Sequence, residues 1–242
     1  MKIAFISSLF GSDRGNLPTV FKKIDGFDYF LFSDRDQSNF KTSWDVHDIS
    51  KNENLTHLNC NIRKSRYAKF LGWELLESMG KNYDFIFYSD VHYSPNYDSD
   101  FKSLAEKVLN NPFPFCQDLH CANHIVQGGI SAECNFIVQC KKDSRESISK
   151  TVRFFKKKFK DVNLRYPKYF ENTMFGYSFH SKEYRKISKD FWNIYTTEDI
   201  SFRDQPLWHV LMFHNNLEPY HKIKLRGDFF SKTGKYGNHY YT

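Results

Sequence analysis

The sequence lacks the glycine-rich loops with which many nucleotide-binding proteins hold phosphate. No G-x-G-x-x-G segment follows an expected strand, and no G-x-x-x-x-G-K-S/T segment occurs among the 11 glycines. Their absence argues against dinucleotide dehydrogenases and P-loop enzymes. A G-x-S-x-G elbow is missing as well, which argues against the serine hydrolases that depend on it.

Long apolar runs and a dense cysteine pattern are also missing. No run approaches the roughly 18–20 apolar residues that a membrane-spanning helix needs. The apolar run at residues 1–8 is too short for a signal peptide and has no cleavage site. The 5 cysteines are an odd number without the spacing of a disulfide framework. We therefore expect a cytoplasmic protein with reduced cysteines and no transmembrane segment.

The composition is that of a folded domain with a basic surface. At 242 residues, 40% hydrophobic and 26% charged, the chain can bury a normal core, and no repeat or linker divides it. The net charge of +7 favours anionic partners. The densest basic run, residues 153–160, is typical of an amphipathic helix with its phenylalanines inward. A peripheral membrane contact or polyanion contact through 153–160 is the alternative.

The pattern of apolar runs predicts an α/β fold. Expected strands cover residues 2–8, 29–34, 44–49, 84–89 and 175–179, and expected helices cover 61–79, 101–109, 147–159, 182–191 and 204–213. Acidic residues close several of these strands. This order predicts a Rossmann-like nucleotide-binding half, with ligands at the carboxyl edge of the sheet. Residues 112–139 give mixed signals.

The most informative segment is Asp90-Val91-His92, which follows the buried strand at residues 84–89. On extended backbone, two residues that are two positions apart point to the same side. A hard carboxylate oxygen and a borderline imidazole nitrogen then suit one divalent cation, Mn²⁺ or Mg²⁺. Without a metal, Asp90 caps a turn and His92 lies on the surface.

Further polar residues lie where the expected fold places a ligand. Asp34 ends the second strand, where it either forms a turn or hydrogen-bonds a nucleotide base or ribose. Arg63, Arg66 and Lys69 form a basic stripe on the helix at 61–79. The stripe is either a solvated face or, beside a nucleotide, a source of phosphate contacts.

Asp204 and Gln205 begin an apolar helix. An N-cap role for Asp204 satisfies backbone donors and needs no chemistry. If the N-terminus of this helix faces a cleft, the Asp204 carboxylate and the Gln205 amide can instead bind sugar hydroxyls, or the carboxylate can act as a general base.

A group of cysteines and histidines lies in the mixed segment, namely Cys116, His120, Cys121 and His124. The spacing is not that of a zinc finger, and no second paired cluster lies nearby. We interpret the segment as lining a pocket rather than as a structural zinc site.

Five blocks in a fixed order carry a family resemblance: Phe10-Gly11, residues 30–34, Arg66 with Lys69, residues 88–92, and residues 203–205. Over roughly residues 2–215 the chain resembles the glycosyltransferase-like family of plant cell-wall and bacterial or viral polysaccharide proteins. That family has the GT-A fold, in which a mixed central sheet is flanked by helices. The resemblance implies a single GT-A-like domain over 1–242, with a nucleotide-sugar-binding half at 1–110 and an acceptor-binding half at 111–242.

The resemblance also implies a reaction, namely transfer of a hexose from a nucleoside-diphosphate sugar, most simply a UDP-sugar, to a glycan hydroxyl. A D-x-D-type motif holds a divalent metal on the donor diphosphate in such enzymes, and His92 here replaces its second Asp. The glycogenin-like, retaining members have an Asp-Gln pair near the donor sugar and a C-terminal histidine on the metal. Asp204 with Gln205, and His239, match these by position, with His221 as the second choice for the histidine. Inverting members place a general-base Asp at a similar helix start.

These assignments form one expected site. The donor-binding residues are Ser7, Phe10, Asp34, Arg66, Lys69, Ser89 and Asp90, and the metal ligands are Asp90, His92 and His239. Two alternatives stay open. One is a basic nucleic-acid-binding protein, which the net charge and the aromatic content favour. The other is a transferase relative that binds a nucleotide sugar without turnover, which the Asp-x-His departure favours.

Overall fold

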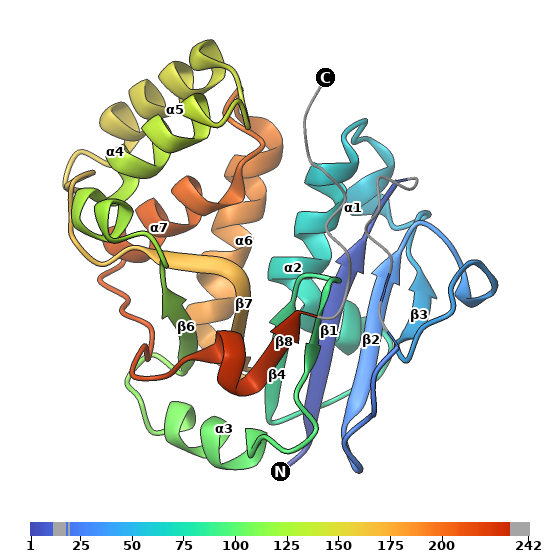
Figure 1. The fold of residues 1–242 in the computed structure, drawn as a ribbon. Coiled ribbons are helices and arrows are strands. Elements are labelled where there is room, and N and C mark those ends of the chain that lie inside the picture. The colour runs from blue at the N-terminus through green and yellow to red at the C-terminus, as the bar shows by residue number, and fades with distance from the viewer. Residues whose placement is uncertain (12–17, 19, 233–242) are drawn as a thin grey trace.

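The computed structural model describes residues 1–11, 18 and 20–232. A single six-stranded sheet in the order β3-β2-β1-β4-β7-β6 forms its centre (Figure 1). The strands are β1 (Ile3–Leu9), β2 (Asp28–Ser33), β3 (Asp45–Asp48), β4 (Phe85–Ser89), β6 (Phe115–Leu119) and β7 (Phe170–Ser178). β1 is parallel to β2 and β4, and β2 is parallel to β3. β7 is antiparallel to both β4 and β6, so the sheet is mixed as predicted.

Helices and a second, small sheet surround the central sheet (Figure 1). The small sheet pairs β5 (Tyr93–Pro95) with β8 (Phe230–Lys232). The helices are α1 (Glu53–Thr56), α2 (Asn61–Ser78), α3 (Phe101–Leu109), α4 (Asn123–Gln139), α5 (Arg145–Lys158), α6 (Lys182–Thr197) and α7 (Asp204–His214). A short 3₁₀ helix, η1 (Gln37–Asn39), and a short π-helical segment, η2 (Leu225–Phe229), complete the elements.

Each face of the sheet buries its own hydrophobic core, because side chains along a strand alternate between faces. In β1, Ala4 and Ile6 join the core shared with α2, α4, α5, α6 and α7. Ile3 and Phe5 join the opposite core, where α3 and the small sheet pack. α2 lies so close to β1 that a Cβ on Gly72 would come within 2.2 Å of the Ile6 side chain. Only glycine permits this approach, which brings the basic side chains of α2 to the sheet edge.

The sequence pattern located the first half of the chain well and the segment 112–139 poorly. The first three expected strands and the helix at 61–79 are confirmed within a few residues, and the strand predicted at 175–179 is the second part of β7. β6 and α4 were not predicted. β6 carries the polar residues Gln117 and Asp118, which hid its strand pattern. α4 is broken at Gly129, whose φ of 59° makes room for the crossing backbone of Tyr166.

The basic run at 153–160 forms the end of α5, as predicted. Phe155 and Phe159 are buried, Phe154 is half-buried, and the lysines at 156–158 are exposed. This confirms the amphipathic arrangement, and a membrane contact through this surface stays a prediction. Within the described part of the chain, no helix is both long enough and apolar enough to span a membrane.

Candidate functional site

The parallel strands β1, β2 and β4 end along one edge of the sheet, and the predicted site residues follow these ends. Leu9 pairs with Ser33 across β1 and β2, and Ile6 pairs with Tyr88 across β1 and β4. The chain then leaves the sheet at Phe10, Asp34 and Asp90. Three segments that are far apart in the sequence therefore meet at the edge where open α/β sheets bind ligands.

Asp34 holds the turn after β1. Its Oδ2 accepts a hydrogen bond of 2.8 Å from the Gly11 backbone N–H. Arg35 lies 3.7 Å from the other carboxylate oxygen and donates a 2.8 Å hydrogen bond to Gly11 O. Phe10, beside this turn, packs half-buried against the core. Asp34 thus has a structural role at this turn, while about a quarter of its side chain remains accessible, 28% in relative terms.

Ser7 and Ser89 are buried beneath the edge. Ser7 Oγ donates a 2.8 Å hydrogen bond to Ser89 O, and Ser89 Oγ donates a longer one of 3.4 Å to Tyr93 O. Both hydroxyls are thus committed to the backbone, and they connect β1 to the loop after β4.

The loop after β4 forms a turn, as the sequence indicates, and does not continue the extended backbone on which the metal argument relied. β4 ends at Ser89, and the Tyr93 N–H donates a 2.9 Å hydrogen bond to Asp90 O, so residues 90–93 form a turn. The argument that Asp90 and His92 share one side of an extended strand is therefore wrong. His92 is only 6% exposed and its ring lies against Tyr93, with 4.7 Å between the centroids. His239 lies outside the described residues.

Asp90 is oriented by two neighbours. Its Oδ1 accepts a 2.9 Å hydrogen bond from the Tyr88 hydroxyl and lies 3.7 Å from Lys69 Nζ. Burial, with the nearby Asp90 charge as the next cause, raises the pKa of Tyr88 well above its usual value. Tyr88 therefore stays protonated and remains a donor to Asp90.

The centre of the site is a buried ionic cluster around Asp204, which is 4% exposed. Arg66 Nε lies 3.0 Å from Asp204 Oδ1, and Lys69 Nζ lies 3.1 Å from Oδ2. Asn172 Nδ2 donates a further hydrogen bond of 3.2 Å to Oδ2. Arg66 and Lys69 therefore point inward and do not form a solvated face. Lys69 lies between Asp90 and Asp204 and so links the loop after β4 to the start of α7.

The electrostatics of the cluster keep Asp204 ionised. Burial alone would raise the pKa of Asp204, but the attraction of Arg66, Lys69 and Arg203 outweighs it and holds the pKa well below its usual range. The pKa of Arg66 is correspondingly raised, because Asp204 overcomes the cost of burying the guanidinium. Buried charges of this kind persist only when they are paired and hydrogen-bonded.

The predicted N-cap role of Asp204 is wrong. Arg203 occupies the N-cap position, its side chain makes no capping hydrogen bond to the helix, and Asp204 is the first helical residue. The carboxylate is directed into the cluster because Arg66 and Lys69 approach it from α2. Gln205 Nε2 donates a 2.8 Å hydrogen bond to Phe170 O, which places it on the other side of the helix start, against β7.

Two residues of the site were missed in the sequence, Asn172 and Gln117. Gln117 Nε2 donates to Asn172 Oδ1 at 2.6 Å and to Glu171 O at 2.8 Å. This chain of hydrogen bonds fixes the amide that contacts Asp204. The sequence signal was the polar run Glu171-Asn172-Thr173 at the start of a strand that is otherwise apolar.

His209 supports the same region from inside the core. It is fully buried and stacks on Tyr169, with 3.9 Å between ring centroids. Its Nε2 accepts a 2.8 Å hydrogen bond from the Phe170 N–H, and its Nδ1 lies 2.8 Å from Gln205 O. Because Nε2 is an acceptor, the ring proton must be on Nδ1. Burial lowers the pKa of His209 to about 3, so the ring is neutral.

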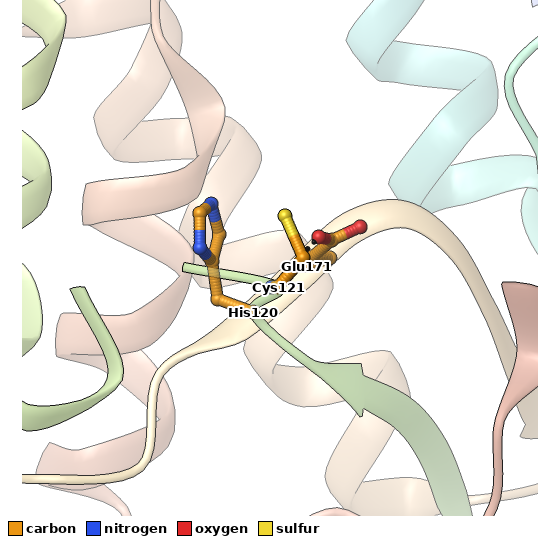
Figure 2. A group of neighbouring side chains, drawn as sticks. All are labelled: His120, Cys121 and Glu171. Atoms are coloured by element: carbon orange, nitrogen blue, oxygen red, sulfur yellow. Dashed lines mark hydrogen bonds between the residues drawn. The ribbon is translucent and has the colours of Figure 1, made fainter. Parts of the chain in front are cut away.

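The mixed segment contributes a second polar group. His120 and Cys121 follow β6 and lie beside Glu171 of β7 (Figure 2). Of the other residues weighed with them, Cys116 is buried in the second core and His124 is exposed. The sequence indicated His120 and Cys121 but not Glu171, which only the pairing of β6 with β7 brings to them.

The comparisons with known proteins define the fold. No protein-family model matches the sequence, and no curated protein matches it. The WbbM bifunctional glycosyltransferase, in its apo structure, is 10% identical with a TM-score of 0.50, over 90% of this chain and 38% of that one. Mouse xyloside xylosyltransferase 1, also in apo form, is 11% identical with a TM-score of 0.49, over 93% of this chain and 86% of that one.

The chain therefore has a GT-A-like glycosyltransferase fold and spans about 38% of the length of WbbM. The predicted fold class is confirmed. Because no family model matches, the narrower family resemblance stays a prediction.

Proposed function

We propose that this protein is a glycosyltransferase that moves a hexose from a nucleoside-diphosphate sugar, most simply a UDP-sugar, to a glycan hydroxyl. The observation that carries the proposal is the buried cluster of Asp204 with Arg66 and Lys69 at the carboxyl edge of the sheet. Lys69 connects this cluster to Asp90 of the loop after β4. The GT-A-like fold supports the proposal, because open α/β sheets bind ligands at the carboxyl edge of their strands, and Asp90 follows the end of β4 at that edge.

In this proposal the nucleoside lies over the ends of β1 and β2. The accessible part of Asp34 faces the base or ribose, and Phe10 forms an apolar wall beside it. Ser7 and Ser89 have committed hydroxyls, so they shape the floor and offer no free donor. The half-site over β1, β2 and β4 corresponds to residues 1–110, and the acceptor lies toward residues 111–242.

Asp90 and His92 are the residues that we assign to a divalent metal, Mn²⁺ or Mg²⁺, together with His239. An oxygen and an imidazole nitrogen form a donor set that Mn²⁺ accepts. Among the described residues, Tyr88 and Lys69 contact Asp90 through Oδ1, so we assign Oδ2 to the metal. When bound, the metal acts as a Lewis acid that neutralises charge on the leaving diphosphate.

The environment of Asp204 favours a retaining reaction over an inverting one. An effective general base has a pKa near the working pH and a free oxygen within reach of the acceptor hydroxyl. Asp204 has a strongly lowered pKa and accepts contacts on both oxygens. We therefore assign Asp204 to electrostatic support of the donor site, and Gln205, whose amide donates to Phe170 O, to positioning the start of α7 beside it.

The alternative of nucleic-acid binding has weaker support. Its best-placed cations at the sheet edge, Arg66 and Lys69, are paired with Asp204 rather than presented to a phosphate backbone. Binding of a nucleotide sugar without turnover uses the same site as the proposed transfer, so turnover has to be measured directly.

The test combines ligand binding with turnover. Thermal shifts with UDP, GDP and their sugar conjugates, with and without Mn²⁺, identify the donor class, because a ligand that binds the native state raises its stability. Release of the nucleoside diphosphate then measures transfer or donor hydrolysis. We expect Asp90→Asn to reduce turnover on the order of 100-fold. Asp98→Asn, at an exposed residue in the same region, is the matched control and retains activity.

The outcomes separate the three candidates. Full activity of Asp90→Asn would remove Asp90 from the metal site. A thermal shift without product release at any donor would favour binding without turnover. Salt-dependent binding of oligonucleotides with no shift by any nucleotide would overturn the proposed function.

A further inference from the structure

His120, Cys121 and Glu171 form a side-chain cluster that shares no residue with the assigned donor-metal ligands (Figure 2). One ligand atom from each residue lies within 4.8 Å of the others. The pairing of Leu119 with Phe170, and the 2.8 Å hydrogen bond from His120 N to Tyr169 O, bring the three residues together. Strand pairing therefore unites ligands that are about fifty positions apart in the sequence.

The three side chains are oriented by neighbouring groups. Glu171 is 6% exposed, and its Oε1 accepts a 3.1 Å hydrogen bond from the Cys121 backbone N–H. Its Oε2 pairs with the Arg226 guanidinium. His120 Nδ1 accepts a 3.1 Å hydrogen bond from the Ala122 N–H. These contacts hold the carboxylate and the imidazole in place before the ion arrives, and the Ala122 contact at Nδ1 is given up when zinc binds.

We propose that His120, Cys121 and Glu171 bind one Zn²⁺ ion. A thiolate, an imidazole and a carboxylate are all zinc ligands, and the thiolate disfavours Mn²⁺ and Mg²⁺, which prefer oxygen. Three protein ligands leave one position of a tetrahedral ion open, and the exposure of Cys121 directs that position to solvent. The donor metal proposed at Asp90 is a different ion with different ligands.

Binding has a defined proton balance. Cys121 loses its thiol proton to solvent as the S–Zn bond forms, so binding strengthens as the pH rises. The ligand nitrogen of His120 must carry no proton. Zinc therefore either replaces the Ala122 N–H at Nδ1 or binds Nε2 after the ring proton has moved to Nδ1. Glu171 binds through an oxygen that now accepts a hydrogen bond.

The ion would stabilise the side of the proposed active site that holds Asn172. Glu171 is the neighbour of Asn172, and Gln117 donates both to Glu171 O and to Asn172 Oδ1. Asn172 in turn contacts Asp204. Joining the loop after β6 to the start of β7 through zinc thus fixes the backbone that positions this amide. We expect zinc to raise the melting temperature of the full chain.

The test uses Co²⁺ as a spectroscopic substitute for Zn²⁺ in protein freed of metal by chelation. We expect one Co²⁺ per chain, with a thiolate-to-metal charge-transfer band in the near ultraviolet, and displacement of Co²⁺ by Zn²⁺. Cys121→Ser removes the band and weakens binding by at least about tenfold. Cys140→Ser, at the other exposed cysteine, leaves the band unchanged. His120→Ala is compared in the same way with His124→Ala, at an exposed histidine on α4.

Several results would overturn the zinc site. One is a charge-transfer band that persists in Cys121→Ser or disappears in Cys140→Ser. Another is metal binding by the wild type that is no tighter than binding by Cys121→Ser. Because Cys121 is exposed, its substitution leaves the core intact, and circular dichroism verifies the fold. The band must also survive in Asp90→Asn, which separates this site from the donor metal and makes the result independent of the proposed function.

Discussion

Replacing Asp204 with Asn tests the buried cluster by electrostatics alone, because Asn has almost the same shape. The variant leaves Arg66 and Lys69 facing each other without their shared counter-charge. The side chains of Asp204 and Lys69 are 5% and 3% exposed, and that of Arg66 is 16% exposed, so water screens these charges little. Removing one partner of a buried ion pair costs about 3–5 kcal/mol of the free energy of unfolding.

The two cations differ in what the substitution leaves them. Lys69 keeps Asp90 as a second counter-charge, 3.7 Å away, which limits the loss. Arg66 cannot become neutral, because a guanidinium stays charged. We therefore expect Asp204→Asn to lose about 3–5 kcal/mol of stability at neutral pH.

The stabilisation that Asp204 contributes should decrease as the pH falls. The pKa of Asp204 is lowered in the folded protein, whereas an unfolded Asp titrates near about 3.9. The stabilisation is therefore fully present above about pH 5 and falls by about 1.4 kcal/mol per pH unit below about pH 4, where only the unfolded chain takes up the proton. The difference in stability between wild type and Asp204→Asn should narrow in the same range.

Urea unfolding of both proteins at neutral and acidic pH measures these quantities. Asp190→Asn is the control, since its ion pair with Lys186 is exposed at both ends and contributes at most about 0.5 kcal/mol. A loss for Asp204→Asn no larger than that of the control would refute the account of the cluster. So would a difference from wild type that does not change with pH.

Two further changes test the interior around the site. His209→Gln should flatten the pH dependence of stability, because burial lowers the pKa of His209 to about 3. The wild-type free energy of unfolding then falls by up to about 1.4 kcal/mol per pH unit as the pH drops below about 6.5, and equal slopes for variant and wild type in urea titrations would contradict this. Gly129→Ala should cost about 2–3 kcal/mol, because the new Cβ would lie 2.4 Å from Tyr166 O at a φ of 59°. Gly80→Ala, with φ 68° and open space, should cost only about 1 kcal/mol, and thermal melts that show equal losses would reject the role of the contact.

The spacing of apolar residues was sufficient to locate the strands and helices in which those residues recur at a regular interval. The first strand and the helix at 61–79 could be located because their apolar residues recur at the spacing of a strand and of a helix. Gly80, with its φ of 68°, follows the last residues of that helix, as the sequence indicated. Asp34 and Asp90 could be placed at strand ends, since the apolar runs before them stop abruptly. β6 and the broken helix α4 could not be found, because buried polar residues and a kink remove the period.

The tertiary structure decided which charged side chains form ion pairs with one another. Arg66 and Lys69 read as a basic surface in the sequence, yet the approach of α7 to α2 buries them against Asp204. Asp204 is the first residue of α7, and its carboxylate pairs with these cations instead of capping the helix. The pairing lowers the pKa of Asp204. The reason is that charge pairing depends on distances across elements, whereas the helical period records only the position of a residue along its own helix.

The sequence by itself determined the α/β class, the order of the first strands and the residues that emerge at the sheet edge. These features follow from the spacing of apolar residues and from the points at which apolar runs end, and both can be read from neighbouring residues in the sequence. Only the tertiary structure decided that Lys69 joins Asp90 to Asp204, that Asn172 reaches Asp204, and that Glu171 joins His120 and Cys121. Such groupings arise where β7 runs antiparallel between β4 and β6, because strand pairing unites residues that no local pattern connects.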